Sequence, residues 1–363
     1  MARTKQVPSA RAPEPVEEAP AVSSTALDEK TIIKADDVER SPAAAGATAS
    51  TSEQRTSKLP LPLQFPLVAI LSFSISSLGY SFLNEYSKGE LATIARSLQS
   101  SQEVALLASW RLLELALGWF GKYDSYDLAA LNVLSHGPPF FLMTAFYGIR
   151  PGTAAACLGV DVLSSFLPFL LLRPLSGAHA GSPTVANREI IVDRSIQAYT
   201  TLLAGAIYSV VLFFSYQTYL PKALVLYFDG IPSIEPAYAS ASVLNSAPAA
   251  SLALLIGLAA RTFIFTPYEA TGHTAQDDEV AQFDPASATL AETLYWNLWG
   301  YTAQTKVAIT RTAVAMALTG VNTYLNCLLS INGIESTGAA LYASVWVLAA
   351  FLTGVGLGVV GRE

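Results

Sequence analysis

The sequence predicts an all-α protein: a polytopic transmembrane helix bundle of about eight crossings, preceded by a disordered N-terminal tail. From about residue 60 onward, long apolar runs, several close to twenty residues, alternate with short polar stretches. Of the 363 residues, 52% are apolar and 13% are charged, and this charged share is about half of what soluble domains usually have. A soluble core of this size could not absorb so much apolar side chain, so we expect the runs to lie in a bilayer.

The first 60 residues have the opposite character. They are rich in Pro, Ala, Ser, Thr and Glu, with almost no aromatic residues and no sustained apolar period. Such a segment cannot bury enough apolar surface to offset the entropy lost on ordering. We therefore expect a disordered cytosolic tail at residues 1–60 and a transmembrane helical domain at residues 61–363.

The first two predicted crossings differ in polarity. Residues 65–83 include nineteen residues without a charge, and a helix of that length, rising about 1.5 Å per residue, covers a hydrocarbon core of about 30 Å. Residues 104–120 form the second crossing. Ser100 and Glu103 precede its apolar part at the spacing of a capping box, which predicts that this helix begins there.

The third and fourth predicted crossings are residues 128–149 and 153–172. The third contains the sequence His-Gly-Pro-Pro, in which Pro138 and Pro139 follow His136 closely. Two consecutive prolines remove two backbone donors from a helix, so a kink or a break is expected at this point.

Four further crossings complete the predicted bundle: residues 196–220, 248–265, 309–329 and 338–360. The stretch between the fifth and sixth, residues 221–247, contains several prolines and is expected to be a loop. An acidic loop separates the sixth from the seventh. Tyr295, Trp296, Trp299 and Tyr301 crowd its second half, as expected where a chain enters a membrane at headgroup level.

The distribution of basic residues predicts that both termini are cytosolic. In that orientation, eight bases lie near cytoplasmic membrane ends and four near the opposite ends, which agrees with the positive-inside rule. The eight are Arg55, Lys58, Lys122, Arg173, Arg188, Arg194, Lys306 and Arg362, and the four are Lys88, Arg96, Arg150 and Lys222. An internal membrane such as the endoplasmic reticulum fits the lack of Asn-X-Ser/Thr glycosylation acceptors.

Four ionisable residues fall at bilayer depth: Arg111, Glu114, His136 and Asp161. Each costs about 3 kcal/mol on insertion scales, so such residues usually face the interior of a bundle and mark a function or a pairing. Arg111 and Glu114 are three residues apart on one helix face and can neutralise each other. Asp161 is expected either to pair with Arg111 or His136 or to take part in proton or cation movement.

The segment around His136 has two competing interpretations. Carbonyl groups left without donors by the double proline can bind an ion or a solute, which would make a transport site. They can equally accept a hydrogen bond from a neighbouring side chain, with His136 in a structural role. The sequence leaves both interpretations open.

Gly354 and Gly358 are four residues apart in the last apolar run. This spacing permits two helices to approach closely. The partner helix could belong to a second copy of the chain, which would make a homo-oligomer, or to the same bundle.

The chain lacks the usual signs of catalysis, metal binding and nucleic-acid binding. It has three histidines and two cysteines, too few for a histidine-rich di-iron site or a cysteine-rich zinc site. No metalloprotease, nucleophile-elbow or phosphate-loop motif occurs, and no basic patch that would bind nucleic acid. We expect no catalytic residue, no metal and no cofactor.

These features predict a multi-pass membrane protein that is not an enzyme and acts as a scaffold or assembly factor. Its expected partners are the lipid bilayer and another membrane protein or a further copy of itself. The alternative is a small-solute or proton-coupled transporter that uses Arg111, Glu114, His136 and Asp161. A membrane enzyme of unfamiliar type is a third, weaker hypothesis.

Overall fold

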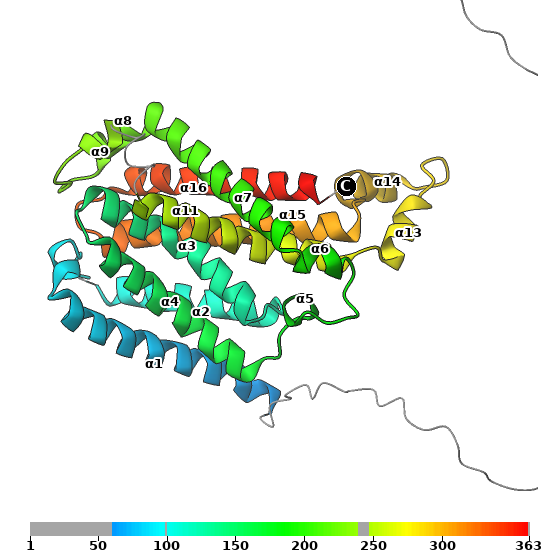
Figure 1. Cartoon of the computed structure of the whole chain (residues 1–363), viewed down its shortest axis with the longest axis horizontal. Coiled ribbons are helices and arrows are strands. Elements are labelled where there is room, and N and C mark those ends of the chain that lie inside the picture. The colour runs from blue at the N-terminus through cyan, green and yellow to red at the C-terminus, as the bar shows by residue number, and fades with distance from the viewer. Residues whose placement is uncertain (1–59, 99, 239–246, 362–363) are drawn as a thin grey trace, which may run out of the picture. The chain divides into compact units, whose positions relative to one another are not determined.

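The computed structural model describes residues 60–98, 100–238 and 247–361. Within these residues the chain is helical, without strands and with two isolated β-bridges (Figure 1). The predicted all-α class is confirmed, whereas the predicted disordered tail lies outside the described residues. The long helices are α1 (Leu61–Ser87), α2 (Ser101–Phe120), α3 (Ser125–Phe146), α4 (Pro151–Leu172), α7 (Arg194–Gln217), α11 (Ala247–Ala260), α15 (Ala303–Ser330) and α16 (Ser336–Val360).

In the described part of the chain, six helical segments are long and apolar enough to cross a membrane, which indicates an integral membrane protein. They are Pro62–Ser87, Pro151–Leu172, Arg194–Gln217, Ala249–Thr271, Ala303–Ser330 and Ser336–Val360. The other two predicted crossings correspond to α2 and α3, which have 20 and 22 residues but more polar side chains. Six of the eight crossings are thus supported by length and composition, and the total of eight stays a prediction.

The outer faces of the long helices are apolar. Ile70 and Phe82 on α1 and Phe214 on α7 are more than 60% exposed. In water, apolar faces of this extent would be unfavourable, since burial of apolar surface contributes about 25 cal/mol per Å². Lipid chains in contact with these faces remove that cost.

The helix α3 lies inside the bundle and packs against α4, α11 and α15. Most of its residues are buried. Of the predicted kink or break, the break is wrong, because α3 continues through Pro138 and Pro139 as one helix, and the kink stays a prediction.

The sixth crossing extends further than predicted. After α11 comes a wide π-helical turn, Arg261–Phe265, and then α12 (Thr266–Thr271). Its acidic residue, Glu269, is buried and accepts a hydrogen bond from Asn187 Nδ2 at 3.0 Å. A partner for this carboxylate lets the helix continue past the predicted end at residue 265.

The connections between the long helices contain short helices. They are η1 (Glu90–Thr93), α5 (Gly177–Ala180), α6 (Arg188–Val192), α8 (Leu220–Tyr227), α9 (Glu235–Tyr238), α13 (Ala275–Ala281) and α14 (Leu290–Trp299). Of the predicted loop at 221–247, residues 239–246 lie outside the described part of the chain.

The turn between α15 and α16 forms backbone hydrogen bonds with two other segments at one end of the bundle. The backbone of Arg96 donates to Ser330 O at 3.0 Å, and Asn332 N donates to Ile94 O at 2.9 Å. On its other side, Asp229 N donates to Gly333 O at 2.6 Å. The segments that follow α1 and α8 are therefore both bonded to the α15–α16 turn.

The two glycines of α16 have different surroundings. A Cβ atom at Gly354 would collide with the side chain of Thr312 on α15, so this glycine allows α15 and α16 to pack closely within the bundle. Gly358 has open space around its Cα and lines a groove of about 370 Å³ between the same helices. The structure therefore supports packing inside the bundle for Gly354, and dimerisation through Gly358 stays a prediction.

Candidate functional site

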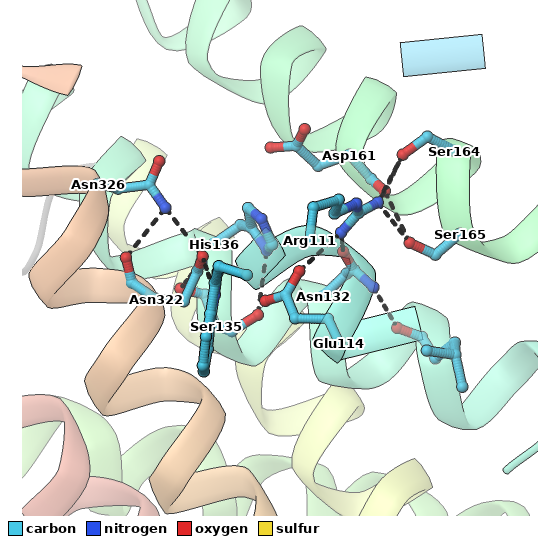
Figure 2. Close-up of polar contacts among 12 residues, drawn as sticks. Arg111, Glu114, Asn132, Ser135, His136, Asp161, Ser164, Ser165, Asn322 and Asn326 are labelled. Carbon is cyan, nitrogen blue, oxygen red and sulfur yellow. Dashed lines mark hydrogen bonds and ion pairs between the residues drawn. The ribbon is translucent and has the colours of Figure 1, made fainter. Parts of the chain in front are cut away.

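The guanidinium of Arg111 lies among α2, α3 and α4 (Figure 2). Its Nη1 donates to Glu114 Oε2 at 3.0 Å and to Asn132 Oδ1, on α3, at 2.9 Å. The side chains of Arg111 and Glu114 are 15% and 6% exposed, so the predicted same-face pair is present and largely buried.

The second guanidinium nitrogen, Nη2, binds α4. It donates to Ser164 Oγ at 2.7 Å, to Ser165 Oγ at 2.6 Å and to the backbone oxygen of Asp161 at 3.2 Å. Both serine hydroxyls in turn donate to that backbone oxygen. We call Arg111, Glu114, Asn132, Asp161, Ser164 and Ser165 the Arg111 network, in which one cation joins three helices.

Asp161 does not pair with Arg111 through its carboxylate. Figure 2 shows this carboxylate turned away from the guanidinium. It accepts a hydrogen bond at 3.0 Å from the hydroxyl of Tyr80, which lies on α1. The expected pairing with Arg111 therefore runs through the backbone, and the carboxylate connects α4 to α1.

His136 is buried on α3, with its Nδ1 at 3.0 Å from the hydroxyl of its neighbour Ser135. Among the described residues, no hydrogen bond or ion pair connects His136 to Asp161. The structure thus brings Arg111, Glu114 and Asp161 into one network and places His136 beside it.

The double proline is compensated by α15. Pro138 and Pro139 lack the amides that would bond to the carbonyls of Leu134 and Ser135, four residues earlier. Thr319 Oγ1 donates to Leu134 O at 3.3 Å, and Asn322 Nδ2 donates to Ser135 O at 3.0 Å. Two side chains of α15 therefore replace the two missing backbone donors, which explains why α3 does not break.

Asn322 also connects α15 to α2. Its Oδ1 accepts from Trp110 Nε1 at 3.2 Å and from Asn326 Nδ2 at 2.9 Å. Thr319, Asn322 and Asn326 were absent from the predicted site residues. Their spacing of three and four residues in an apolar run is a sequence signal that could have identified a polar helix face.

A second buried cluster lies where α3 begins. Arg311, on α15, donates to Asp127 Oδ1 at 2.6 Å and to Asp127 Oδ2 at 3.2 Å. Its guanidinium carbon also lies 4.9 Å from the ring centres of Tyr123 and Phe263. This bidentate pair, enclosed by aromatic rings, fixes the start of α3 to α15.

Asp124 caps α3 by accepting from Asp127 N at 2.9 Å, and it binds the loop that follows α4. His179 Nδ1 lies 2.7 Å and Ser176 Oγ 2.7 Å from Asp124 Oδ2. Burial opposes the charged form of His179, but the hydrogen bond and charge of Asp124 outweigh it and raise the pKa of His179. The same contacts outweigh the desolvation of Asp124 and hold the pKa of its carboxyl well below the usual range.

Asp124, Asp127 and His179 offer ligand atoms that lie within 4.8 Å of one another, a geometry that could hold a metal ion. The guanidinium of Arg311 is already bound to Asp127, and Ser176 to Asp124. A cation would have to displace a positive charge, so this Asp124 cluster fits an internal ion-pair network better than a metal site. This cluster has no local signal in the sequence, because its partners are 55 and 184 residues apart.

The formal charges of the Arg111 network do not balance. With both carboxyls ionised, the single cation of Arg111 faces the two negative charges of Glu114 and Asp161. Glu114 Oε1 is buried without a hydrogen-bond partner among the described residues. A bound proton or cation would neutralise the extra negative charge of the network. This feature of the network favours ion coupling.

A large cavity lies at another place in the bundle. A cavity of about 800 Å³ between α3, α4 and α11 is lined mostly by apolar side chains, with Thr144, Arg150 and Ser251 among its polar ones. Neither Arg111, Glu114, His136 nor Asp161 lines it.

No family model, curated protein or solved structure matches this chain.

Proposed function

We propose that this protein is a membrane scaffold or assembly factor without catalytic activity of its own. The supporting observation is the use of its buried polar groups, which bind one another across helices. Arg111 joins α2, α3 and α4, while Thr319 and Asn322 take the two carbonyl groups freed by the prolines. Inside a membrane, such hydrogen bonds hold helices together, whereas transport groups face a water-filled cavity.

In the proposed topology all eight long helices cross an internal membrane, such as the endoplasmic reticulum, and both termini are cytosolic. Two observations support it. The start of α1 and the end of α16 lie at the same end of the bundle, as an even number of crossings requires (Figure 1). In the sequence, the distribution of Lys and Arg around the eight predicted crossings also agrees with the positive-inside rule for this orientation.

The proposed partner is another membrane protein or a further copy of this chain. Support comes from the small residues along α16, since Gly358 leaves room for a close approach that α15 does not fill. Tagged full-length protein, purified in mild detergent after crosslinking in the membrane, should carry a partner at a fixed molar ratio. Repeated recovery of a lone monomer would contradict the scaffold proposal.

A proton-coupled transporter is the second candidate, supported by the unbalanced charge of the Arg111 network. The two candidates differ in what Asp161→Asn does. A transporter would move protons across proteoliposomes containing an entrapped pH-sensitive dye, and the variant would fold but lose this flux. A scaffold shows no flux above empty vesicles, and its variant keeps the partner ratio.

A matched variant makes this comparison specific. Asp278→Asn removes an exposed acid from α13, far from the bilayer interior, where the side chain pairs with His273. It should behave as wild type in both assays. Flux that Asp161→Asn abolishes and Asp278→Asn preserves would overturn the scaffold proposal in favour of transport.

A further inference from the structure

The connection between α12 and α15 lies at the end of the bundle where α16 ends (Figure 1). It joins two helices of membrane length, Ala249–Thr271 and Ala303–Ser330, so it remains on one face of the membrane where both helices leave the bilayer. Asp277, on α13, accepts a hydrogen bond from Ala303 N at 2.7 Å. This bond from the first turn of α15 lowers the pKa of Asp277 and holds α13 at the membrane end of α15.

The outer side of α14 is apolar. Leu290, Leu294 and Leu298, spaced four residues apart, are 87%, 59% and 66% exposed, and every residue of α14 is at least partly exposed. A helix with such a stripe, next to the ends of two membrane helices, buries it in the interface between headgroups and acyl chains. The polar side of α14 then faces the headgroup layer.

On the side of α14 that packs against α13 lies a cavity of about 580 Å³ that is open to the surface, a volume typical of small-molecule sites. Tyr295, Trp296 and Trp299 of α14 line it, together with Phe283. The rings of Phe283 and Trp296 are stacked with their centres 4.9 Å apart, and Trp296 Nε1 donates to Val280 O at 3.4 Å. These contacts hold α14 against α13 and set the aromatic wall.

The same cavity contains three carboxylates and one amine: Glu279, Asp284, Glu292 and Lys306. Glu292 accepts from the Thr289 amide at 2.8 Å, which lowers the pKa of its carboxyl and keeps it ionised. Aromatic faces together with carboxylates attract a quaternary ammonium group, while the lysine amine attracts a phosphate. A headgroup that carries both charges a few ångströms apart matches this wall, whereas an anionic headgroup would meet three carboxylates.

We propose that the cavity between α13 and α14 binds the phosphocholine headgroup of a membrane lipid. The ammonium lies against the aromatic rings and the carboxylates, and the phosphate lies at Lys306. The acyl chains continue along the exposed leucines of α14. The site is independent of the scaffold proposal and would exist in a transporter as well.

The test uses the full-length protein in a maltoside detergent, titrated with short-chain phosphatidylcholine below its micelle concentration. Intrinsic tryptophan fluorescence reports binding because Trp296 and Trp299 line the cavity. We expect phosphatidylcholine to bind about tenfold more tightly than phosphatidylglycerol with the same chains, a ratio within the range of a single ammonium–aromatic contact. Glu279→Gln and Lys306→Gln should each weaken phosphatidylcholine binding several-fold.

Asp278→Asn is the matched control, because Asp278 is the neighbouring acid of α13 and does not line the cavity. It should leave the affinity unchanged. Equal affinity for the two lipids, absence of binding, or equal losses in Asp278→Asn and Glu279→Gln would overturn the proposal. Glycerophosphocholine has no acyl chains. If it bound as tightly as the lipid, the proposed contact between the acyl chains and α14 would be overturned.

Discussion

Arg111 offers the sharpest test of how this bundle is held together. Its side chain is 15% exposed and lies 3.0 Å from Glu114, which is 6% exposed. Arg111→Met removes the cation and leaves the carboxylate of Glu114 buried without its counter-charge, which typically costs about 3–5 kcal/mol of unfolding free energy. Glu114→Gln keeps the guanidinium, which still has acceptors on α3 and α4, so a smaller loss of about 1–3 kcal/mol is expected.

The double variant separates the pair from the other contacts of Arg111. Bonds from Arg111 to α3 and α4 are lost equally in Arg111→Met and in the double variant, so they cancel in a double-mutant cycle. The coupling free energy between Arg111 and Glu114 should be about 2 kcal/mol. Arg111→Met leaves the carboxylate of Glu114 buried without its counter-charge, and Glu114→Gln in the double variant removes that charge. Exposed ion pairs couple by about 0–1 kcal/mol.

Equilibrium unfolding in mixed micelles, followed by far-UV circular dichroism, measures these free energies. The pair Arg96–Glu103 is the matched control, since it also joins an arginine to a glutamate, at 2.7 Å, but with side chains 33% and 22% exposed. Its coupling should stay within the range of exposed pairs. A coupling for Arg111 and Glu114 no larger than that of the control would refute the structural role of the network.

Three further outcomes follow from the packing and the ionisation of the described residues. Gly354→Ala should lower stability by about 1–3 kcal/mol through overpacking against α15, whereas Gly358→Ala, which has open space, should be neutral or slightly stabilising in thermal unfolding. Asn322→Leu should destabilise by about 1–2 kcal/mol, because each membrane hydrogen bond contributes about 0.6 kcal/mol and three are lost; an unchanged unfolding midpoint would contradict it. Burial opposes the charged form of His179, but its bond to Asp124 raises the pKa, so its stabilising contribution is complete below about pH 6.5 and is lost as the pH rises through the folded pKa. The thermal unfolding midpoint should therefore fall as the pH rises above about 6.5 in wild type, and should fall less in His179→Gln. The lowered pKa of Asp124 adds the opposite limit, a loss of stability below about pH 4.

The sequence was a good guide to the helices because apolar length is a local property. Each predicted crossing corresponds to a long helix, and the Arg111–Glu114 pair follows from a spacing of three residues. Predicted ends were less accurate where a buried partner let a helix continue. Glu269 is an example, since its hydrogen bond with Asn187 could not be inferred from either residue alone.

Pro138 and Pro139 show most clearly what the sequence determined and what it left open. The sequence by itself determined an apolar helical chain, and it determined that two carbonyl groups of α3 would lack their backbone donors. Only the tertiary structure decided what those carbonyls bind, because Thr319 and Asn322 come from a helix about 185 residues further along the chain. Likewise, packing alone turned the Asp161 carboxylate towards Tyr80 and brought Arg311 to Asp127. Helix formation depends on neighbours within four residues, whereas the pairing of buried polar groups depends on which helices lie side by side.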